Sequence, residues 1–172
     1  MLLIILEGVD STGKSSLAKF LARKEEAAYF HASGHRDMYP AMFAHHDNML
    51  NNIEVCMENG LSVVVDRHWP SEFAYGAVLR PSNLAKYDFK KMQERIDNLD
   101  PIYIRCVPDE NSWKRYQEVH KDHDREVFRH FTQSEYFAIN GEYQALFDNI
   151  PHLVYSIAEN GHDMNEFWKL LP

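Results

Sequence analysis

Residues 2–22, LLIILEGVDSTGKSSLAKFLA, contain the strongest signal for the fold of this protein. The five apolar residues at 2–6 are typical of a buried strand, and residues 8–15 then match the pattern G-x-x-x-x-G-K-[S/T] in full. Apolar residues at 17, 20 and 21 follow with spacings of three and four, which indicates a helix with one buried face. A strand, a glycine-containing loop and a helix in this order favour a phosphate-binding loop over an ordinary turn.

The residue types in this loop suit an anion and a divalent cation together. Gly8 and Gly13 allow the backbone to curl so that its N–H groups point inward, and the amino terminus of the helix adds partial positive charge. Lys14 is expected to reach the outer phosphates, and the Ser15 hydroxyl to bind Mg²⁺. We therefore predict that a nucleoside triphosphate is bound by the loop residues Gly8, Ser11, Thr12, Gly13, Lys14, Ser15 and Ser16.

The size and charge of the chain limit the kind of protein that it can be. Its 172 residues predict one compact domain over residues 1–172. A net charge of −8 disfavours a protein that coats nucleic acid. The two cysteines fit no metal spacing, no signal peptide is recognised, and no apolar run reaches membrane-spanning length. We expect a reduced, cytoplasmic protein with no nucleic-acid or membrane partner.

Predicted strands and helices alternate along the rest of the chain. Apolar runs predict four further strands, at 28–32, 61–65, 102–107 and 153–157. Helical spacing predicts intervening helices at about 40–59, 71–79, 87–99, 108–116, 134–147 and 164–171. This order predicts a three-layer α/β fold around a doubly wound, parallel five-stranded sheet, as in P-loop NTPases and nucleoside monophosphate kinases. The ligands of such a sheet bind at the carboxyl ends of its strands.

Asp66 and Arg67 follow the third predicted strand, at the edge of the sheet where ligands bind. A carboxylate at this place can orient Mg²⁺ or its waters, and a helix cap is the alternative use of Asp66. The planar, bidentate guanidinium of Arg67 suits a second phosphate, that of an acceptor, and a surface salt bridge is its alternative.

Residues 114–131 are dense in charge and histidine. A solvated helical face explains many such runs. This one, however, lies between the fourth strand and the last long helix, where nucleotide kinases keep a lid whose cations close over the transferred group. We predict a lid here, with Arg125 as its acting cation and Lys121, Arg115 and Arg129 as the next candidates.

Aromatic and histidine side chains have a structural use as well as a functional one. Phe43, Trp69, Phe73 and Tyr75 are candidates either for stacking on a base or for the core. The helix over 134–147 is expected to bury Phe137, Ile139, Tyr143 and Leu146. None of the ten histidines lies at structural-zinc spacing, so we expect them to be exposed or hydrogen-bonded.

Three segments resemble the thymidylate kinase family of P-loop nucleoside monophosphate kinases. ILEGVDSTGKSSLAKFLA (5–22) is similar to that family's E-G-x-[D/E]-x-x-G-K-[S/T] motif, with Glu7 before the loop and Asp10 within it. VVVDRHWPSEFAYG (63–76) is similar to its strand that ends in D-R-Y, followed by a serine and an Ala-Tyr pair. SEYFAINGEYQALF (134–147) is similar to its helix after the lid.

The resemblance implies transfer of the ATP γ-phosphoryl group to a deoxynucleoside 5′-monophosphate, dTMP or a related deoxynucleotide, with Mg²⁺ as cofactor. By position, Asp10 contacts the region of the acceptor's sugar 3′-hydroxyl, Arg67 contacts its phosphate, and Tyr75 matches the Ala-Tyr pair. Some family members carry an arginine in the loop where this chain has Ser11, and others supply it from the lid. This chain resembles the second kind, which favours Arg125 as the lid cation.

Two departures from the family's pattern concern the acceptor. The family's R-E-P-G segment has no clean counterpart in residues 32–40, where Arg36 is the candidate replacement for its arginine. The helix that reads thymine normally offers an arginine, and AMFAHHDNMLNN (41–52) contains none, so the preferred base is open. Phe43 is the candidate for stacking on that base. These features suit a viral or otherwise divergent member, with a homodimer as a possible assembly.

Other functions compete with a monophosphate kinase. A deoxynucleoside kinase phosphorylates the neutral 5′-hydroxyl of a nucleoside and needs a carboxylate base, for which Glu7 or Asp66 is available. A GTPase-like switch would carry an N-K-x-D segment to read guanine, and the sequence has none. An inactive scaffold is disfavoured because Lys14 and Ser15 are intact.

Overall fold

One parallel sheet organises the molecule. A computed structural model describes residues 1–32, 42–81, 88–121, 130–160 and 163–172. Within them, five strands pair in the order β2-β3-β1-β4-β5, and every pair is parallel. The strands are β1 (Leu3–Glu7), β2 (Ala28–His31), β3 (Val63–Asp66), β4 (Pro101–Cys106) and β5 (His152–Tyr155). The predicted three-layer α/β fold with a parallel five-stranded sheet is therefore confirmed.

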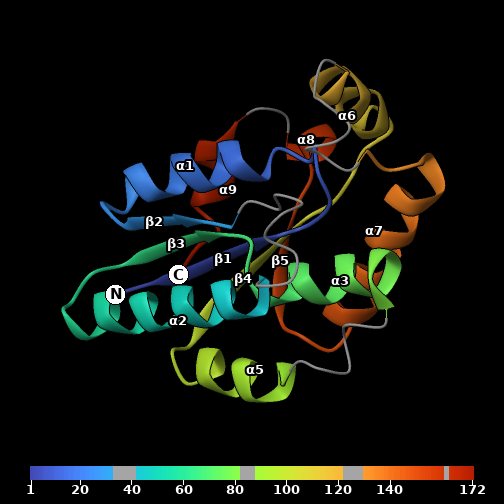
Figure 1. Cartoon of the computed structure of the whole chain (residues 1–172). Coiled ribbons are helices and arrows are strands. Elements are labelled where there is room, and N and C mark those ends of the chain that lie inside the picture. The colour runs from blue at the N-terminus through green and yellow to red at the C-terminus, as the bar shows by residue number, and fades with distance from the viewer. Residues whose placement is uncertain (33–41, 82–87, 122–129, 161–162) are drawn as a thin grey trace.

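Helices cover both faces of the sheet (Figure 1). On one face lie α1 (Lys14–Lys24) and α9 (Met164–Trp168). The opposite face carries α2 (Met42–Glu58), α3 (Trp69–Leu79), α5 (Phe89–Asp97) and α7 (Gln133–Phe147). Beyond the carboxyl ends of β4 and β5 lie α6 (Ser112–His120) and α8 (Ile157–Asn160). No helix in the described ranges is both long enough and apolar enough to cross a bilayer.

The alternation of side chains along β1 explains the two cores. Ile4 and Leu6 pack against the α1 and α9 face, whereas Leu3 and Ile5 belong to the cluster on the opposite face. All four side chains are almost fully buried. A central strand that is covered on both faces needs the continuous apolar run seen in the sequence.

The register of the strands gathers polar residues at one edge of the sheet. Leu6 of β1 pairs with Asp66 of β3, and Asp66 in turn pairs with His31 of β2. Glu7, the last residue of β1, pairs with Arg105 of β4. The carboxyl ends of four neighbouring strands thus bring two carboxylates, an arginine and a histidine close to the glycine loop.

Several predicted elements differ from the observed ones in their ends or in their buried faces. The helix α3 begins at Trp69 rather than at 71, because Pro70 suits the first turn of a helix. The closing helix ends at Trp168 instead of 171, and the short α8 was not predicted. The predicted buried position of Phe137 in α7 is wrong, since that side chain is 47% exposed. The residues that α7 buries are Tyr136, Ile139, Tyr143 and Phe147.

Candidate active site

The loop between β1 and α1 is curled tightly. Gly8 has a φ of +139°, and a Cβ atom there would lie 2.1 Å from the carbonyl oxygen of Cys106, so only glycine fits. Gly13 has a φ of +80° immediately before α1 begins. Within the loop, the Thr12 hydroxyl donates to the Val9 carbonyl at 2.9 Å. The two glycines therefore have the backbone roles that the motif predicts.

Lys14, Ser15 and Asp66 meet at the start of α1. The Lys14 Nζ atom lies 3.5 Å from Asp66 Oδ1, and both side chains are buried. Burial by itself would raise the pKa of Asp66. The hydrogen bond from His31, the charge of Lys14 and the contact with the Ser15 hydroxyl outweigh burial and lower that pKa. Asp66 is therefore an ionised carboxylate beside the loop lysine.

Ser15 and Asp66 suit the magnesium ion that the motif implies. They contribute a hydroxyl and a carboxylate, and oxygen atoms are the ligands that Mg²⁺ prefers. Asp66 Oδ1 is buried and has no hydrogen-bond partner among the described residues. A buried oxygen without a donor is available to a cation or to its bound water. In the described ranges, this site included, no group of three or more His, Cys, Asp or Glu residues is arranged to hold a metal.

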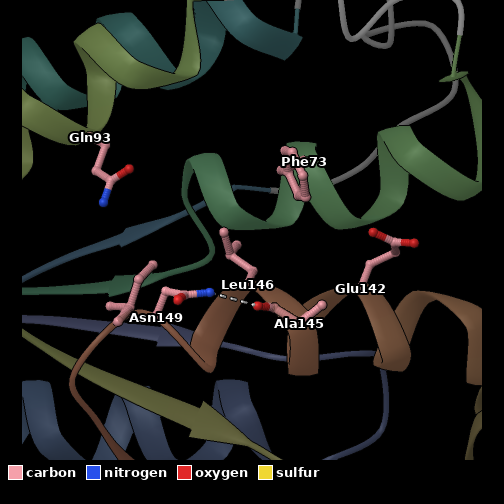
Figure 2. A pocket seen from close by; sticks show the side chains of 7 residues that line it. Phe73, Gln93, Glu142, Ala145, Leu146 and Asn149 are labelled. Carbon is pink, nitrogen blue, oxygen red and sulfur yellow. Dashed lines mark hydrogen bonds between the residues drawn. The ribbon is translucent and has the colours of Figure 1, made fainter.

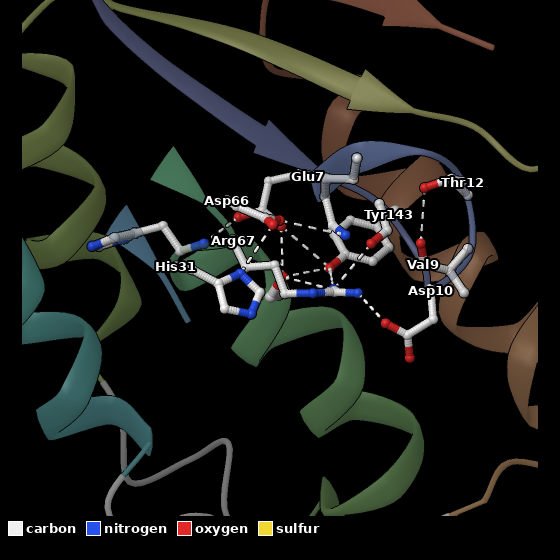
Figure 3. Close-up of polar contacts among 12 residues, drawn as sticks. Glu7, Val9, Asp10, Thr12, His31, Asp66, Arg67 and Tyr143 are labelled. Atoms are coloured by element: carbon white, nitrogen blue, oxygen red, sulfur yellow. Dashed lines mark hydrogen bonds and ion pairs between the residues drawn. The ribbon is translucent and has the colours of Figure 1, made fainter. Parts of the chain in front are cut away.

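Arg67 is buried in a polar network at the end of β3 (Figure 3). Its Nη1 atom donates to the Gly8 carbonyl at 3.0 Å, to Ser71 Oγ at 3.2 Å and to the Tyr143 hydroxyl at 3.3 Å. Its Nη2 atom forms an ion pair with Asp10. The Arg67 guanidinium is therefore held beside the glycine loop.

Glu7 supports Arg67 from the interior. Its carboxylate accepts the His68 backbone N–H at 2.6 Å, the Ser71 hydroxyl at 2.6 Å and the Tyr143 hydroxyl at 3.2 Å. Burial raises the pKa of Glu7 to about 7, although the hydrogen bonds from Ser71 and His68 and the charges of Arg67 and Lys14 oppose the rise. Because Glu7 is fully buried and holds three donors, it faces the protein rather than an acceptor.

Helices α6 and α7 fix the outer part of the loop. The Tyr136 hydroxyl donates to the Asp10 carbonyl at 2.7 Å. Arg115 donates twice to the Ser11 carbonyl, both times at 3.2 Å, and pairs with Asp109 at 2.8 Å. Of the lid candidates, Arg115 is therefore bound to the loop backbone. Residues 122–129 of the predicted lid, which include Arg125 and Arg129, lie outside the described residues, as does the predicted acceptor residue Arg36.

The four aromatic candidates divide between the site and the core. Tyr75 lies at the site, since its ring centre is 5.0 Å from the Arg67 guanidinium carbon. Phe43, Trp69 and Phe73 instead pack around Phe89 of α5, with centroid distances of 5.8, 6.1 and 5.6 Å.

Two histidines are buried side by side, and one of them differs from the sequence-based expectation. His46 and His68 are fully buried with their rings 5.2 Å apart. Neither ring nitrogen of His46 has a hydrogen-bond partner among the described residues, so the expectation of exposed or hydrogen-bonded histidines is wrong for this residue. Burial and the neighbouring His68 lower the pKa of His46, and burial lowers the pKa of His68 to about 3. Both rings are therefore neutral.

Some site residues carried no functional prediction. Tyr143 and Ser71 complete the Glu7–Arg67 network, and His31 and Tyr29 of β2 both contact Asp66. Two polar residues at alternate positions near the carboxyl end of a strand share one face, and this pattern is the signal that marks them.

A hollow of about 300 Å³ lies among α3, α5 and α7 (Figure 2). It is lined by Phe73, one of the candidates for base stacking, and by none of the residues predicted to bind phosphate. Its lining consists of Phe73, Gln93, Glu142, Ala145, Leu146, Asn149 and Ile150.

The sheet order, the curled glycine loop and the polar strand ends define an α/β protein with the P-loop kinase fold. Solved structures with this fold include the Bacillus subtilis YorR protein in complex with phosphorylated GDP. Its TM-score is 0.66, and the two sequences are 17% identical over 97% of this chain and 91% of that one. M. mycoides deoxyadenosine kinase with bound dATP has a TM-score of 0.62 and 14% identity over 98% and 97%. The same kinase with the products dCMP and dCDP has a TM-score of 0.60 and 13% identity over the same shares. No protein-family model matches the sequence, and no curated protein matches it.

Proposed function

We propose that the protein transfers the γ-phosphoryl group of ATP, with Mg²⁺, to a deoxynucleoside 5′-monophosphate. One observation carries the proposal: Lys14 at the start of α1 and Arg67 at the end of β3 are both buried beside the glycine loop, and Asp10 of the loop pairs with Arg67. Two cations beside one glycine loop suit two phosphate groups that face each other.

In this proposal, most of the catalysis is positioning and charge stabilisation. Lys14 and the loop N–H groups hold the outer phosphates of ATP, and Arg67 holds the acceptor phosphate. Ser15 and Asp66 would hold Mg²⁺, which would neutralise charge on the triphosphate. The acceptor oxygen is already anionic, so no strong general base is needed. Arg125 of the lid closes over the transferred group and excludes water.

The acceptor contacts follow from position. Asp10 serves the sugar 3′-hydroxyl, Tyr75 lies beside the acceptor phosphate, and Arg36 adds a second cation. Phe43, which packs against Phe89 and is only partly buried, is the proposed stacking partner of the base, with dTMP or a related deoxynucleotide as the acceptor. A cytoplasmic location and a homodimer remain part of the proposal.

A deoxynucleoside kinase is the second candidate. The fold shared with M. mycoides deoxyadenosine kinase favours it, as does Asp66 Oδ1, a buried carboxylate oxygen without a donor among the described residues. Glu7 suits the base less well, because three donors already surround its carboxylate.

One panel of acceptors separates the two candidates. Purified protein is incubated with ATP and Mg²⁺ and with each common deoxynucleoside, deoxynucleoside monophosphate and ribonucleoside monophosphate, and the products are separated by ion-exchange chromatography. We expect diphosphates from one or more deoxynucleoside monophosphates. If only nucleosides give products, the deoxynucleoside kinase replaces the monophosphate kinase as the proposed function.

A further inference from the structure

The carboxylate of Asp66 is anchored from the side of the sheet that lies away from the loop. Its Oδ2 atom accepts the His31 Nδ1–H at 2.9 Å and the Tyr29 hydroxyl at 3.2 Å. Both donors come from β2, whose register places His31 directly opposite Asp66 and Tyr29 opposite Val64. The three polar side chains therefore project from the same face of the sheet, the face on which α1 and Lys14 lie.

The two oxygens of Asp66 consequently have different surroundings. Oδ2 accepts two hydrogen bonds from β2, whereas Oδ1 faces Lys14 at 3.5 Å and has no hydrogen-bond partner among the described residues. Figure 3 shows this carboxylate between the β2 side chains and the loop. We infer that His31 is a positioning residue for the metal: by locking Oδ2, it presents Oδ1 of Asp66 to the cation bound with the triphosphate.

This inference rests on the proposed use of MgATP. When a triphosphate binds, Lys14 turns to its phosphates, and Asp66 loses the cation that now faces Oδ1. A buried carboxylate without partners would be free to rotate. The two donors from β2 remain in place, because they depend on strand pairing rather than on the loop. They hold Asp66 in one orientation, with Oδ1 directed at the cation site.

His31 is the better of the two anchors to test. Its hydrogen bond is the shorter one, and its side chain is 42% exposed, so its removal leaves no core cavity. A hydrogen bond from a histidine N–H can fix the orientation of a carboxylate that binds a metal, and the Nδ1–H of His31 makes this bond. Asparagine places an amide N–H close to the position of Nδ1, whereas alanine has no donor, and this difference provides a matched pair of variants.

The experiment measures metal binding without any acceptor. ATP affinity is determined by calorimetry in EDTA, and Mg²⁺ is then titrated at saturating ATP, for the wild type, His31→Ala, His31→Asn and Tyr29→Phe. Mn²⁺ is titrated in parallel and its free fraction is read by electron paramagnetic resonance. Thermal unfolding of each variant checks that the fold is kept.

We expect His31→Ala to bind metal-free ATP within about twofold of the wild type and to bind Mg²⁺ and Mn²⁺ about tenfold more weakly. His31→Asn should restore most of the metal affinity, and Tyr29→Phe should show a smaller loss. Unchanged metal affinity in His31→Ala overturns the inference. A loss of equal size in His31→Asn overturns it too, because the imidazole itself would then be required. Because no acceptor is present, a wild type that binds MgATP normally and yet phosphorylates nothing refutes the proposed function alone.

Discussion

Arg67 has an unfavourable backbone conformation for a residue with a side chain. Its φ of 75° lies in the left-handed region, which costs roughly 1–2 kcal/mol for a non-glycine residue. Contacts with Gly8, Ser71, Tyr143 and Asp10 compensate for this cost. A strained residue that so many groups hold in place is typical of a functional site. The strain therefore agrees with a role for Arg67 in acceptor binding.

Arg67→Ala should weaken acceptor binding much more than ATP binding. Loss of a charged, hydrogen-bonded partner of a phosphate costs about 2–5 kcal/mol, so the acceptor Kd should rise at least about 30-fold. ATP affinity should change less than about threefold, since Lys14 and the loop remain. Calorimetry with each ligand measures both values. Arg67→Lys is the matched control, and it should fall between the two because it keeps the charge without the planar fork. Equal losses for both ligands would contradict the assignment.

Lys14→Ala should stop phosphoryl transfer while the fold remains. Removal of one preorganised donor to a developing charge typically costs 10²–10³-fold in kcat, or about 3–4 kcal/mol. The Asp66 partner keeps its donors Tyr29 and His31, so thermal unfolding should change little. Lys19→Ala, on the exposed side of α1, is the control and should retain full activity. Turnover of Lys14→Ala close to that of the control would contradict a role for the loop lysine in the reaction.

At the scale of elements, α7 connects the buried network to the loop. Tyr143 reaches Glu7, Ser71 and Arg67, and Tyr136, two turns earlier on the same face, reaches the Asp10 carbonyl. A capping box formed by Thr132 and Glu135 fixes where this helix begins. The position of α7 therefore determines how Glu7, Asp10 and Arg67 are held.

Tyr143→Phe tests this connection. The substitution removes one hydroxyl from a buried network of three partners, so the free energy of unfolding should fall by about 1–3 kcal/mol. For a chain of this length, that loss lowers Tm by about 2–12 °C. The acceptor KM should rise as well, because Arg67 loses one of its acceptors. Phe137→Ala, on the exposed side of the same helix, should change neither quantity. A Tyr143→Phe protein as stable and active as the wild type would show that the Tyr143 hydroxyl does not support the site.

The elements that the sequence predicts best are those with one strong local signal. The glycine motif predicts the loop and α1, and the apolar runs predict all five strands to within a few residues. On α7 the sequence identifies the buried Ile139 and Tyr143 but selects Phe137 in place of Tyr136, because these two are adjacent aromatic residues and helical spacing alone does not choose between them. The anchoring of Asp66 by Tyr29 and His31 also escaped prediction, since it depends on which strands are neighbours and on their register. Local patterns contain neither of these facts.

At the scale of the whole molecule, folding encloses ionisable groups with opposite responses to pH. The buried Glu7 has a pKa raised to about 7, and the buried His68 has a pKa lowered to about 3. As the pH falls from 7 to 5, the folded protein binds a proton at Glu7 that the unfolded chain binds only at lower pH, which favours folding. The unfolded chain binds a proton at His68 that the folded protein does not, which opposes folding. His46, whose pKa burial also lowers, acts in the same direction as His68. The total pH dependence is therefore a sum of opposing contributions, and a single curve does not separate them.

A comparison of the wild type with His68→Phe isolates the histidine. The lowered pKa means that folding excludes a proton from His68 between pH 6.5 and about 3, so its contribution to stability is lost as the solution becomes more acidic. At pH 5 this loss amounts to about 2 kcal/mol, from 1.5 pH units at about 1.4 kcal/mol each. Urea unfolding at pH 7 and at pH 5 gives the change for each protein. The change in His68→Phe should be smaller by that amount, because the Glu7 contribution is common to both proteins and cancels. Equal changes in the two proteins would mean that His68 reaches solvent and titrates normally in the folded state.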